Sequence, residues 1–213
     1  MATLNSSDMA AGIVLSNGDL TASYGSSSYK GVRSTTSKSW GLFYVEFTVD
    51  AGYNNEGPIV GISTQGTTLT NYPGSTTTGW GYFFGMGVTT GTKRWGGAAT
   101  NYGSGYGANG DIVGMAININ TRKIWFAKNG SWLESGDPAA DSSPAFSNLP
   151  SIPVFAHVDV RRSTCTVNFG ASAFTYTPPS GFVSWDTDAG FPLAEVGYRR
   201  VTPRVNLHNR TWL

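Results

Sequence analysis

A pair of carboxylates would indicate a glycosidase, because two Asp or Glu side chains placed across one bond carry out most glycoside hydrolysis. The glutamates of this chain are Glu46, Glu56, Glu134 and Glu195. Glu46 lies in a segment that alternates like a β-strand, and the residues at strand spacing on either side are Tyr44 and Thr48. No acidic partner therefore shares its face, and the sequence disfavours a glycosidase.

Metal-ligating residues are sparse. His157 and His208 are far apart, and Cys165 adds no zinc-binding spacing. His157 lies in a β pattern beside Asp159, which favours a hydrogen-bonded structural histidine over a ligand. Asp137 and Asp141 offer oxygen ligands, but the segment GDPAAD lacks the alternating carboxylates of a calcium loop. We expect neither a metal nor another cofactor.

Aromatic and arginine side chains in loops are the strongest candidates for function. Such residues dominate interface hot spots, because Tyr and Trp offer large contact areas and Arg adds planar hydrogen bonding. Packing at the edge of the domain is the alternative role for each. The predicted partner-binding residues are Tyr29, Arg33, Tyr72, Trp95, Tyr102, Arg161 and Arg162.

Composition limits the function classes. The chain has 213 residues, 13% of them charged, with a net charge of +1, so no global field attracts nucleic acid. No apolar run is long enough to cross a bilayer, and the N-terminal residues lack a signal-peptide pattern. We therefore expect no membrane insertion and, without a signal peptide, a cytoplasmic protein unless the chain is encoded by a phage. The 28 glycines and the Ser/Thr-rich segments favour short strands joined by turns.

One stretch, Gly110 to Leu133, predicts a three-stranded meander. The apolar run at 112–117 is typical of a strand covered on both faces, whereas Lys123 to Lys128 alternates and should have one wetter face. Asn129 and Gly130 then predict a type I′ reversal.

The rest of the chain reads mostly as strands and loops of an all-β domain. Trp40 to Val49 alternates most clearly and predicts a long strand. Ser23 to Ser39 is Gly/Ser-rich and predicts a surface loop. Between Gly85 and Tyr106, recurring glycines predict hairpins whose tips project aromatic and basic groups. The single cysteine, Cys165, reads as a buried, inert thiol.

Several motifs in this order resemble the SPRY domain family from about Asn5 to Trp185. They are WGLFYVEF (40–47), IVGI (59–62), WGY (80–82), GDIVGMA (110–116), IWFAKNG (124–130) and VNFG (167–170). The resemblance implies a bent two-sheet antiparallel β-sandwich of the concanavalin-like kind, which acts as a non-enzymatic protein-interaction module through loops at one end. Residues 134–182 are most similar to the stand-alone variety of phage and bacterial proteins.

The resemblance also assigns roles to residues. By loop correspondence it favours Tyr29, Arg33, Tyr72, Arg161 and Arg162 as ligand contacts. It places Trp80, Trp125, Trp132 and Phe169 in core motifs, and we expect Trp125, Phe126 and Trp132 to hold the two sheets together.

A second region begins after Trp185. We assign residues 1–185 to the sandwich and 186–213 to a C-terminal arm, which carries four arginines and few apolar residues. Tyr198 to Leu207 alternates locally and could add a strand to a partner or wrap a neighbouring subunit. The predicted docking residues of the arm are Tyr198, Arg200, Val205, Leu207 and Trp212.

These observations lead to one expected function and one alternative. The first is a phage virion protein, structural or receptor-recognising, in which loops present the binding surface and the arm anchors it to a protein partner, a larger assembly or a homo-oligomer. The alternative is a carbohydrate-binding module for host-surface glycans, because concanavalin-like sandwiches with aromatic loops bind sugars. A cryptic glycosidase is a third and weaker reading.

Overall fold

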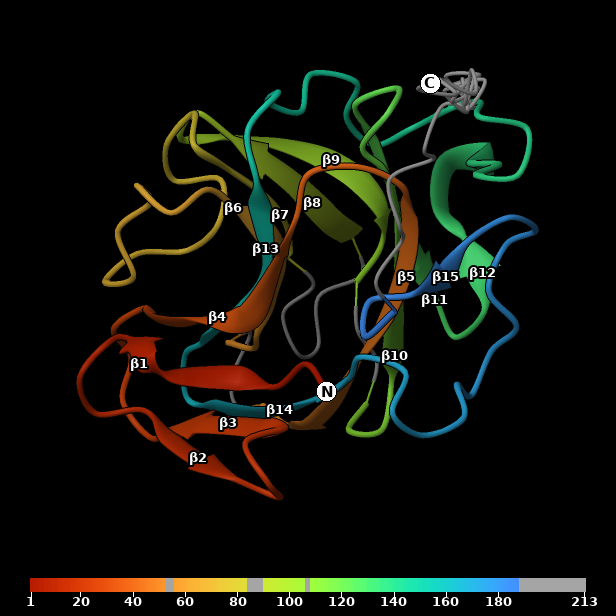
Figure 1. The fold of residues 1–213 in the computed structure, drawn as a ribbon. Coiled ribbons are helices and arrows are strands. Elements are labelled where there is room, and N and C mark those ends of the chain that lie inside the picture. Colours follow the sequence, from red (N-terminus) through yellow and green to blue (C-terminus); the bar gives the residue numbers. More distant parts are fainter. Residues whose placement is uncertain (53–55, 84–89, 106–107, 188–213) are drawn as a thin grey trace, which may run out of the picture.

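The computed structural model describes residues 1–52, 56–83, 90–105 and 108–187, and these form two facing β-sheets (Figure 1). The first sheet contains, in spatial order, β1 (Leu4–Met9), β4 (Lys30–Lys38), β13 (Val154–Val160), β6 (Ile59–Ser63), β7 (Gly79–Phe83), β8 (Thr90–Trp95) and β9 (Ala98–Ser104). The second contains β12 (Ser131–Trp132), β11 (Lys123–Lys128), β10 (Ile112–Asn118), β5 (Leu42–Ala51), β14 (Ser163–Asn168), β3 (Thr21–Tyr24) and β2 (Val14–Ser16). The predicted two-sheet β-sandwich is confirmed.

The second sheet is strongly bent, curving in Figure 1 from β11 on the right to β2 at the lower left. Its centre is β5, whose alternation is confirmed: Phe43, Val45, Phe47 and Val49 all lie in the main core between the sheets. The core is closed from the other side by strands such as β13, where Val158 and Val160 are fully buried. Burial on this scale supplies most of the driving force for folding.

The predicted meander is confirmed as β10, β11 and β12. Asn129 and Gly130 have φ values of 47° and 79°, as a type I′ turn requires. The prediction that one face of β11 is more exposed to solvent is wrong, however, because the outer face of this strand is covered. There Trp125 belongs to a second cluster with Tyr44, Ala116 and Phe182.

This second cluster corrects the role of two tryptophans. Of the three residues expected between the sheets, Phe126 lies in the main core, while Trp125 and Trp132 pack on the outer face. The reason is the two-residue period of a strand, since Trp125 points opposite to Phe126. The segment after β14 returns over this face and supplies Phe174 and Phe182 as its cover.

The return segment ends in β15 (Val183–Ser184), which pairs in parallel with β5 at Phe43 and Tyr44. The antiparallel strand β14 pairs with β5 further along, between Glu46 and Ala51. One edge of β5 is thus shared by two segments of opposite direction. The remaining regular element described is a short 3-10 turn at Leu133–Ser135.

The surface loop predicted at Ser23 to Ser39 is wrong. Most of that segment is β4, a nine-residue strand with β1 on one side and β13 on the other. Its Gly and Ser residues have weak strand propensity, but the two neighbouring strands supply the hydrogen bonds. Pairing and burial decide strand formation more than intrinsic preference does.

Candidate functional site

Four side chains from separate parts of the chain stack on one another at the surface. The Arg161 guanidinium lies 4.9 Å from the centre of the Tyr29 ring. Tyr29 meets Tyr72 edge to face at a centroid distance of 4.7 Å. Arg94 lies 5.0 Å from the Tyr72 ring and 4.9 Å from that of Phe83. We call Tyr29, Tyr72, Arg94 and Arg161 the stacked surface.

Each member of the stacked surface comes from a different element. Tyr29 immediately precedes β4, Tyr72 lies in the loop of residues 64–78, Arg94 is on β8, and Arg161 follows β13. The loop reaches the other three because it folds back over the outside of the first sheet, where the Leu69 carbonyl accepts a hydrogen bond from the Gly31 N–H (2.8 Å). The four side chains are partly buried, so the rings and guanidinium groups remain accessible.

Arg161 is held at both ends of its guanidinium. Its Nε donates to the Ser27 carbonyl (2.7 Å) and its Nη1 to the Tyr29 hydroxyl (3.1 Å). Its Nη2 lies 2.7 Å from Glu56 Oε1, while Nε of the more exposed Arg162 lies 3.5 Å from Glu56 Oε2. The side chain is therefore ordered before any partner arrives, which reduces the entropic cost of binding.

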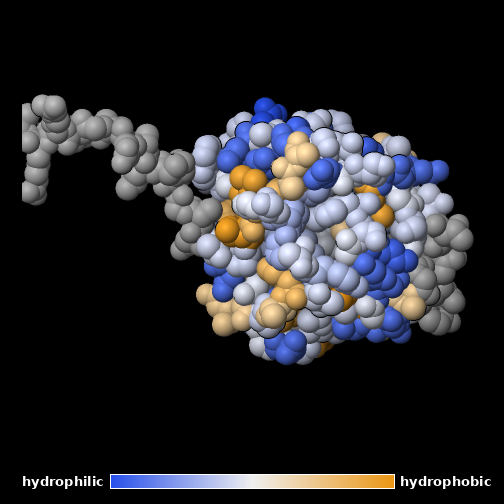
Figure 2. Space-filling view, turned by 90° about the vertical axis from the view of Figure 1, so that its right-hand side faces the viewer, coloured by the Kyte–Doolittle hydropathy of each residue, from blue (hydrophilic) through white to orange (hydrophobic). Residues whose placement is uncertain are grey.

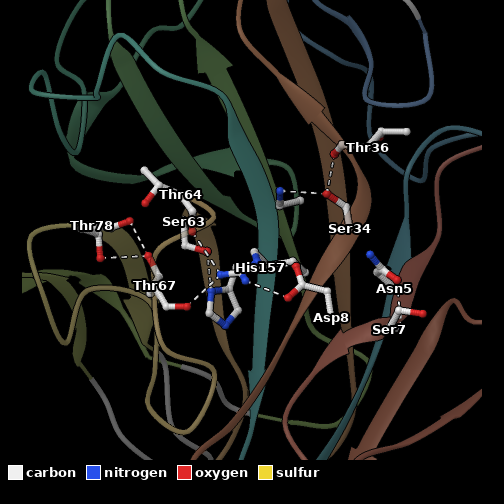
Figure 3. A network of polar contacts seen from close by, with 12 residues as sticks. Asn5, Ser7, Asp8, Ser34, Thr36, Ser63, Thr64, Thr67, Thr78 and His157 are labelled. Carbon is white, nitrogen blue, oxygen red and sulfur yellow. Dashed lines mark hydrogen bonds and ion pairs between the residues drawn. The ribbon is translucent and has the colours of Figure 1, made fainter.

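Arg33 is not part of this surface, and its expected exposure is wrong: the side chain is only 3% exposed. Three of its hydrogen-bond partners, Asp8, Thr64 and Thr67, are labelled in Figure 3. Its Nε and Nη2 donate to the Asp8 carboxylate at 2.7 and 2.8 Å. Its Nη1 donates to the carbonyls of Thr64 (3.1 Å) and Thr67 (2.9 Å). Arg33 thus fastens the loop that carries Tyr72.

Tyr102 is the second correction, because it is only 4% exposed. It lies on β9 facing the core, where it meets Tyr82 edge to face at 5.9 Å, and burial is the main cause that raises its pKa above the usual value. Trp95, by contrast, is 38% exposed at the tip of the β8–β9 hairpin, as predicted for a hairpin tip.

Arg94 belongs to the stacked surface but is not among the predicted partner-binding residues. The signal for it was the alternation of β8, where Lys93 and Arg94 must point to opposite faces. Lys93 points inward and donates to the Ala145 carbonyl (2.8 Å), so Arg94 is left on the outer face. Whether Tyr72 would meet it depended on the path of the 64–78 loop, which no local pattern predicts.

A groove of about 420 Å³ opens on the other side of the Arg161–Arg162 turn. Its lining includes Val14, Tyr24, Ala51, Arg162 and Thr164. Arg162 therefore borders the groove, and the groove and the stacked surface flank the same turn.

Figure 2 shows a different face, the one that carries β11, β12 and β15 on the right of Figure 1. Apolar residues there form small groups separated by polar ones, without a broad apolar patch. This pattern is ordinary for a protein surface and marks no docking site on that face.

The first two residues after the predicted boundary at Trp185 contact the sandwich. Asp186 accepts a hydrogen bond from the Ala2 N–H and lies 3.5 Å from the N-terminal amine. The Thr187 carbonyl accepts from Lys38 Nζ (2.9 Å). Asp186 and Thr187 are thus held by residues of the sandwich, and the division at Trp185 stays a prediction. The predicted docking residues Tyr198, Arg200, Val205, Leu207 and Trp212 lie outside the described residues.

The titratable groups inside the sandwich have structural roles. Glu46 accepts hydrogen bonds from the Tyr44 hydroxyl (3.1 Å) and from the N–H groups of Thr175 (2.9 Å) and Tyr176 (2.8 Å). This carboxylate anchors the return segment. Burial raises the pKa of the Cys165 thiol, which favours the inert form.

His157 and Asp159 lie side by side on the outer face of β13, and both are fully buried. His157 Nδ1 lies 2.9 Å from Ser63 Oγ, in agreement with a hydrogen-bonded structural histidine. Burial lowers the pKa of His157 to about 3 and raises that of Asp159 well above its usual value. His157 is therefore neutral near pH 7. Within the described ranges no cluster of His, Cys, Asp and Glu is suited to a metal ion, and no helix is long and apolar enough to span a membrane.

Comparison with known proteins places this geometry in a family. The model of the SPRY domain family matches residues 42–172. The ATP-dependent RNA helicase Ddx1 of Drosophila melanogaster is 30% identical over 157 residues, which cover 73% of this chain but only 19% of the helicase.

Solved structures agree in fold. The SPRY domain of human HERC1 superposes with a TM-score of 0.62 at 15% identity, covering 80% of this chain and 99% of that domain. The PSpry domain of TRIM65 gives 0.58 at 14% identity, with 78% and 91% covered. The chain therefore belongs to the SPRY domain family, whose members serve as protein-interaction modules.

Proposed function

We propose that the chain is a non-enzymatic protein-interaction module and that its partner contacts the stacked surface. The observation that carries this proposal is the ordered stack of Tyr29, Tyr72, Arg94 and Arg161. Aromatic and arginine side chains that are already fixed in place are the usual anchors of protein interfaces. Glu46 accepts hydrogen bonds from backbone N–H groups, and Glu56 forms an ion pair with Arg161. These structural roles of the carboxylates agree with a module that binds a partner.

The stack favours a protein over a glycan as the ligand. Sugars bind by laying an apolar face on an open aromatic ring. The Tyr29 ring is covered by Arg161, and the Tyr72 ring is contacted by Tyr29 and Arg94. These rings instead present edges, hydroxyls and guanidinium groups, which suit the carbonyls and carboxylates of a polypeptide.

The test is selection of peptides from a random display library on the immobilised protein, followed by affinity measurement with variants. Tyr72→Ala and Arg161→Ala should each weaken the selected peptides by roughly 10- to 30-fold, the loss typical of an interface anchor. Trp40→Ala is the control, because Trp40 is an exposed aromatic residue (38%) that follows the far end of β4. Selected peptides that bind both variants as tightly as the control would contradict the proposal.

A finer proposal concerns setting. We infer that this module serves in a phage particle, as a structural or receptor-recognising protein, with the residues after Thr187 as its anchor. The support is the sequence: the phage-like pattern of residues 134–182 and the basic, locally alternating segment at 198–207. Incorporation of a 1–187 fragment into particles at the normal level would defeat the anchoring role.

The alternative function, glycan binding, is favoured by one observation, the exposed Trp95 at the hairpin tip. An indole beside two glycines offers an open ring face. Binding on a glycan array that is lost in Trp95→Ala but kept in Tyr72→Ala would support this alternative.

A further inference from the structure

The outer edge of β9 differs from the other sheet edges that the structure describes. β2 and β12 are three and two residues long, and β1 is tied at its start, where the Leu4 N–H donates to the Asp19 carbonyl (2.8 Å). β9 has seven residues, and its first four, Ala98 to Asn101, are exposed. Edge strands are normally protected by Lys, Pro or very short length. These four residues include neither Lys nor Pro.

The β8–β9 hairpin determines which main-chain groups face outward. Gly96 and Gly97 have φ values of 61° and 81°, so they form a two-residue type I′ turn. Trp95 and Ala98 then form the first hydrogen-bonded pair, and such pairs alternate along an antiparallel ladder. Ala98 and Thr100 therefore point their N–H and C=O groups at β8, while Ala99 and Asn101 point theirs away from the sheet.

The open edge is short and rigid. Beyond Asn101 it closes, because the Gly103 N–H donates to Glu134 Oε1 (2.9 Å). At the other end the turn is fixed on the 64–78 loop: the Gly96 N–H donates to the Thr76 carbonyl (3.2 Å) and the Gly97 N–H to that of Gly74 (2.9 Å). The backbone groups of this edge are already ordered before a strand is added, so the entropic cost of ordering them on binding is small.

The side chains beside this edge indicate what would pair with it. Ala99 is opposite Arg94, on the outer face, and Ala98 is opposite Trp95, on the other face. Both alanines are small, so side chains of an added strand can reach over them. The hairpin of residues 90–104 contains Lys93 and Arg94 and no acidic residue. An added strand fits best with carboxylates on the Arg94 face and apolar side chains on the Trp95 face.

A second copy of the chain fits this edge less well. Four residues with small side chains bury far less than the roughly 1,200 Å² that a stable interface needs. Two copies would also bring hairpins of the same positive charge together.

We propose that the outer edge of β9 at Ala98–Asn101 is a docking site for an extended protein segment that alternates carboxylate and apolar side chains. This strand-addition mode draws its affinity from main-chain hydrogen bonds and its specificity from alternate side chains. The site uses main-chain groups of β9 that the stacked surface does not use, and it shares only Arg94 with that surface.

The probe is the acetylated and amidated peptide VEVEVEV, compared with VKVKVKV, in an NMR titration of the full chain. VEVEVEV should shift the amide signals of Ala99 and Asn101 and slow their hydrogen exchange, while those of Ala98 and Thr100 are already protected. Ala99→Pro removes only an outward N–H and should weaken binding about fivefold, the effect of one hydrogen bond. Ala99→Val keeps the N–H and should retain the wild-type affinity.

Four results would overturn the proposal. They are absence of binding at about 2 mM peptide, a concentration that reveals even millimolar affinity; equal binding of VKVKVKV; protection confined to other amides; and self-association of the wild type that Ala99→Pro abolishes. The last would assign the edge to a second copy. If Ala99→Pro does not fold, amide hydrogen exchange of the wild type with VEVEVEV still shows whether the peptide protects Ala99 and Asn101.

Discussion

Arg33 shows how a buried charge can organise an exposed surface. Its guanidinium satisfies one carboxylate and two loop carbonyls, and the loop it holds carries Tyr72. Buried pairs contribute little net stability compared with apolar packing, but removing one partner leaves the other charge buried and unpaired. The stacked surface therefore depends on a residue that contacts no ligand.

Arg33→Met should lower the free energy of unfolding by about 3–5 kcal/mol, because Asp8 and the Thr64 and Thr67 carbonyls lose their donor. Urea denaturation measures the loss. The double variant Asp8→Ala/Arg33→Met should recover part of it, because no unpaired carboxylate remains. A loss below about 1 kcal/mol in the single variant would show that water replaces the guanidinium.

His157 and Asp159 give opposite contributions to the pH dependence of stability. His157 has a folded-state pKa of about 3, below its unfolded value, so its contribution is complete above about pH 6.5 and is lost as the pH falls towards 3. Asp159 has a raised pKa, so its folded state binds the extra proton and stability is lost as the pH rises above about 4. Just above about pH 4 the two slopes therefore oppose each other.

Single variants should reveal these slopes. Relative to the wild type, Asp159→Asn should lose stability as the pH falls towards about 4, by up to about 1.4 kcal/mol per pH unit. His157→Gln should show the opposite sign over the same range. Denaturation midpoints across this range measure both, and parallel profiles for the two variants would refute the assignment of the protons.

At the scale of elements, β15 illustrates how the return segment completes the second sheet. Trp185 follows β15, is fully buried in the main core and lies 5.8 Å from Phe43. Its backbone N–H also donates to the Tyr44 carbonyl (3.0 Å). A two-residue strand is thus fixed mainly by the tryptophan beside it.

Trp185→Ala should lower the free energy of unfolding by about 3–5 kcal/mol through the cavity it leaves. Val183→Ala is the matched control, because Val183 is 39% exposed on the same segment and should cost below about 1 kcal/mol. Similar losses in both variants would mean that the segment is fixed by its backbone pairing and not by Trp185.

The elements differ in how far the sequence predicts them. β5, β10 and β11 were predictable because apolar periodicity and an Asn-Gly turn are local signals. β4 was not, because its Ser, Thr and Gly residues form a strand only between β1 and β13. The same limit applies to the site: Tyr29, Tyr72 and Arg161 were expected from loop position, but Arg33 is buried beneath the 64–78 loop and Tyr102 points into the core. Their burial depends on strand register, which no single segment specifies.

At the scale of the whole molecule, the end of the sandwich can be tested by truncation. A 1–187 fragment should keep the thermal midpoint of the full chain, because the described contacts end at Thr187. A 1–185 fragment should lose about 1–3 kcal/mol, since Lys38 and the Ala2 N–H lose their acceptors. Differential scanning calorimetry compares the two fragments. A lower midpoint for 1–187 would show that residues after Thr187 stabilise the sandwich.

The contact between Ala2 and Asp186 has a consequence for synthesis. A ribosome releases the first strand long before the residues that hold it in place, so β1 and β4 leave the exit tunnel without β13 or the segment that ends at Thr187. The nascent chain cannot close its sandwich in stages from the N-terminus. Productive folding must await almost the entire domain, and until then the early strands are the part of the protein most dependent on protection by chaperones.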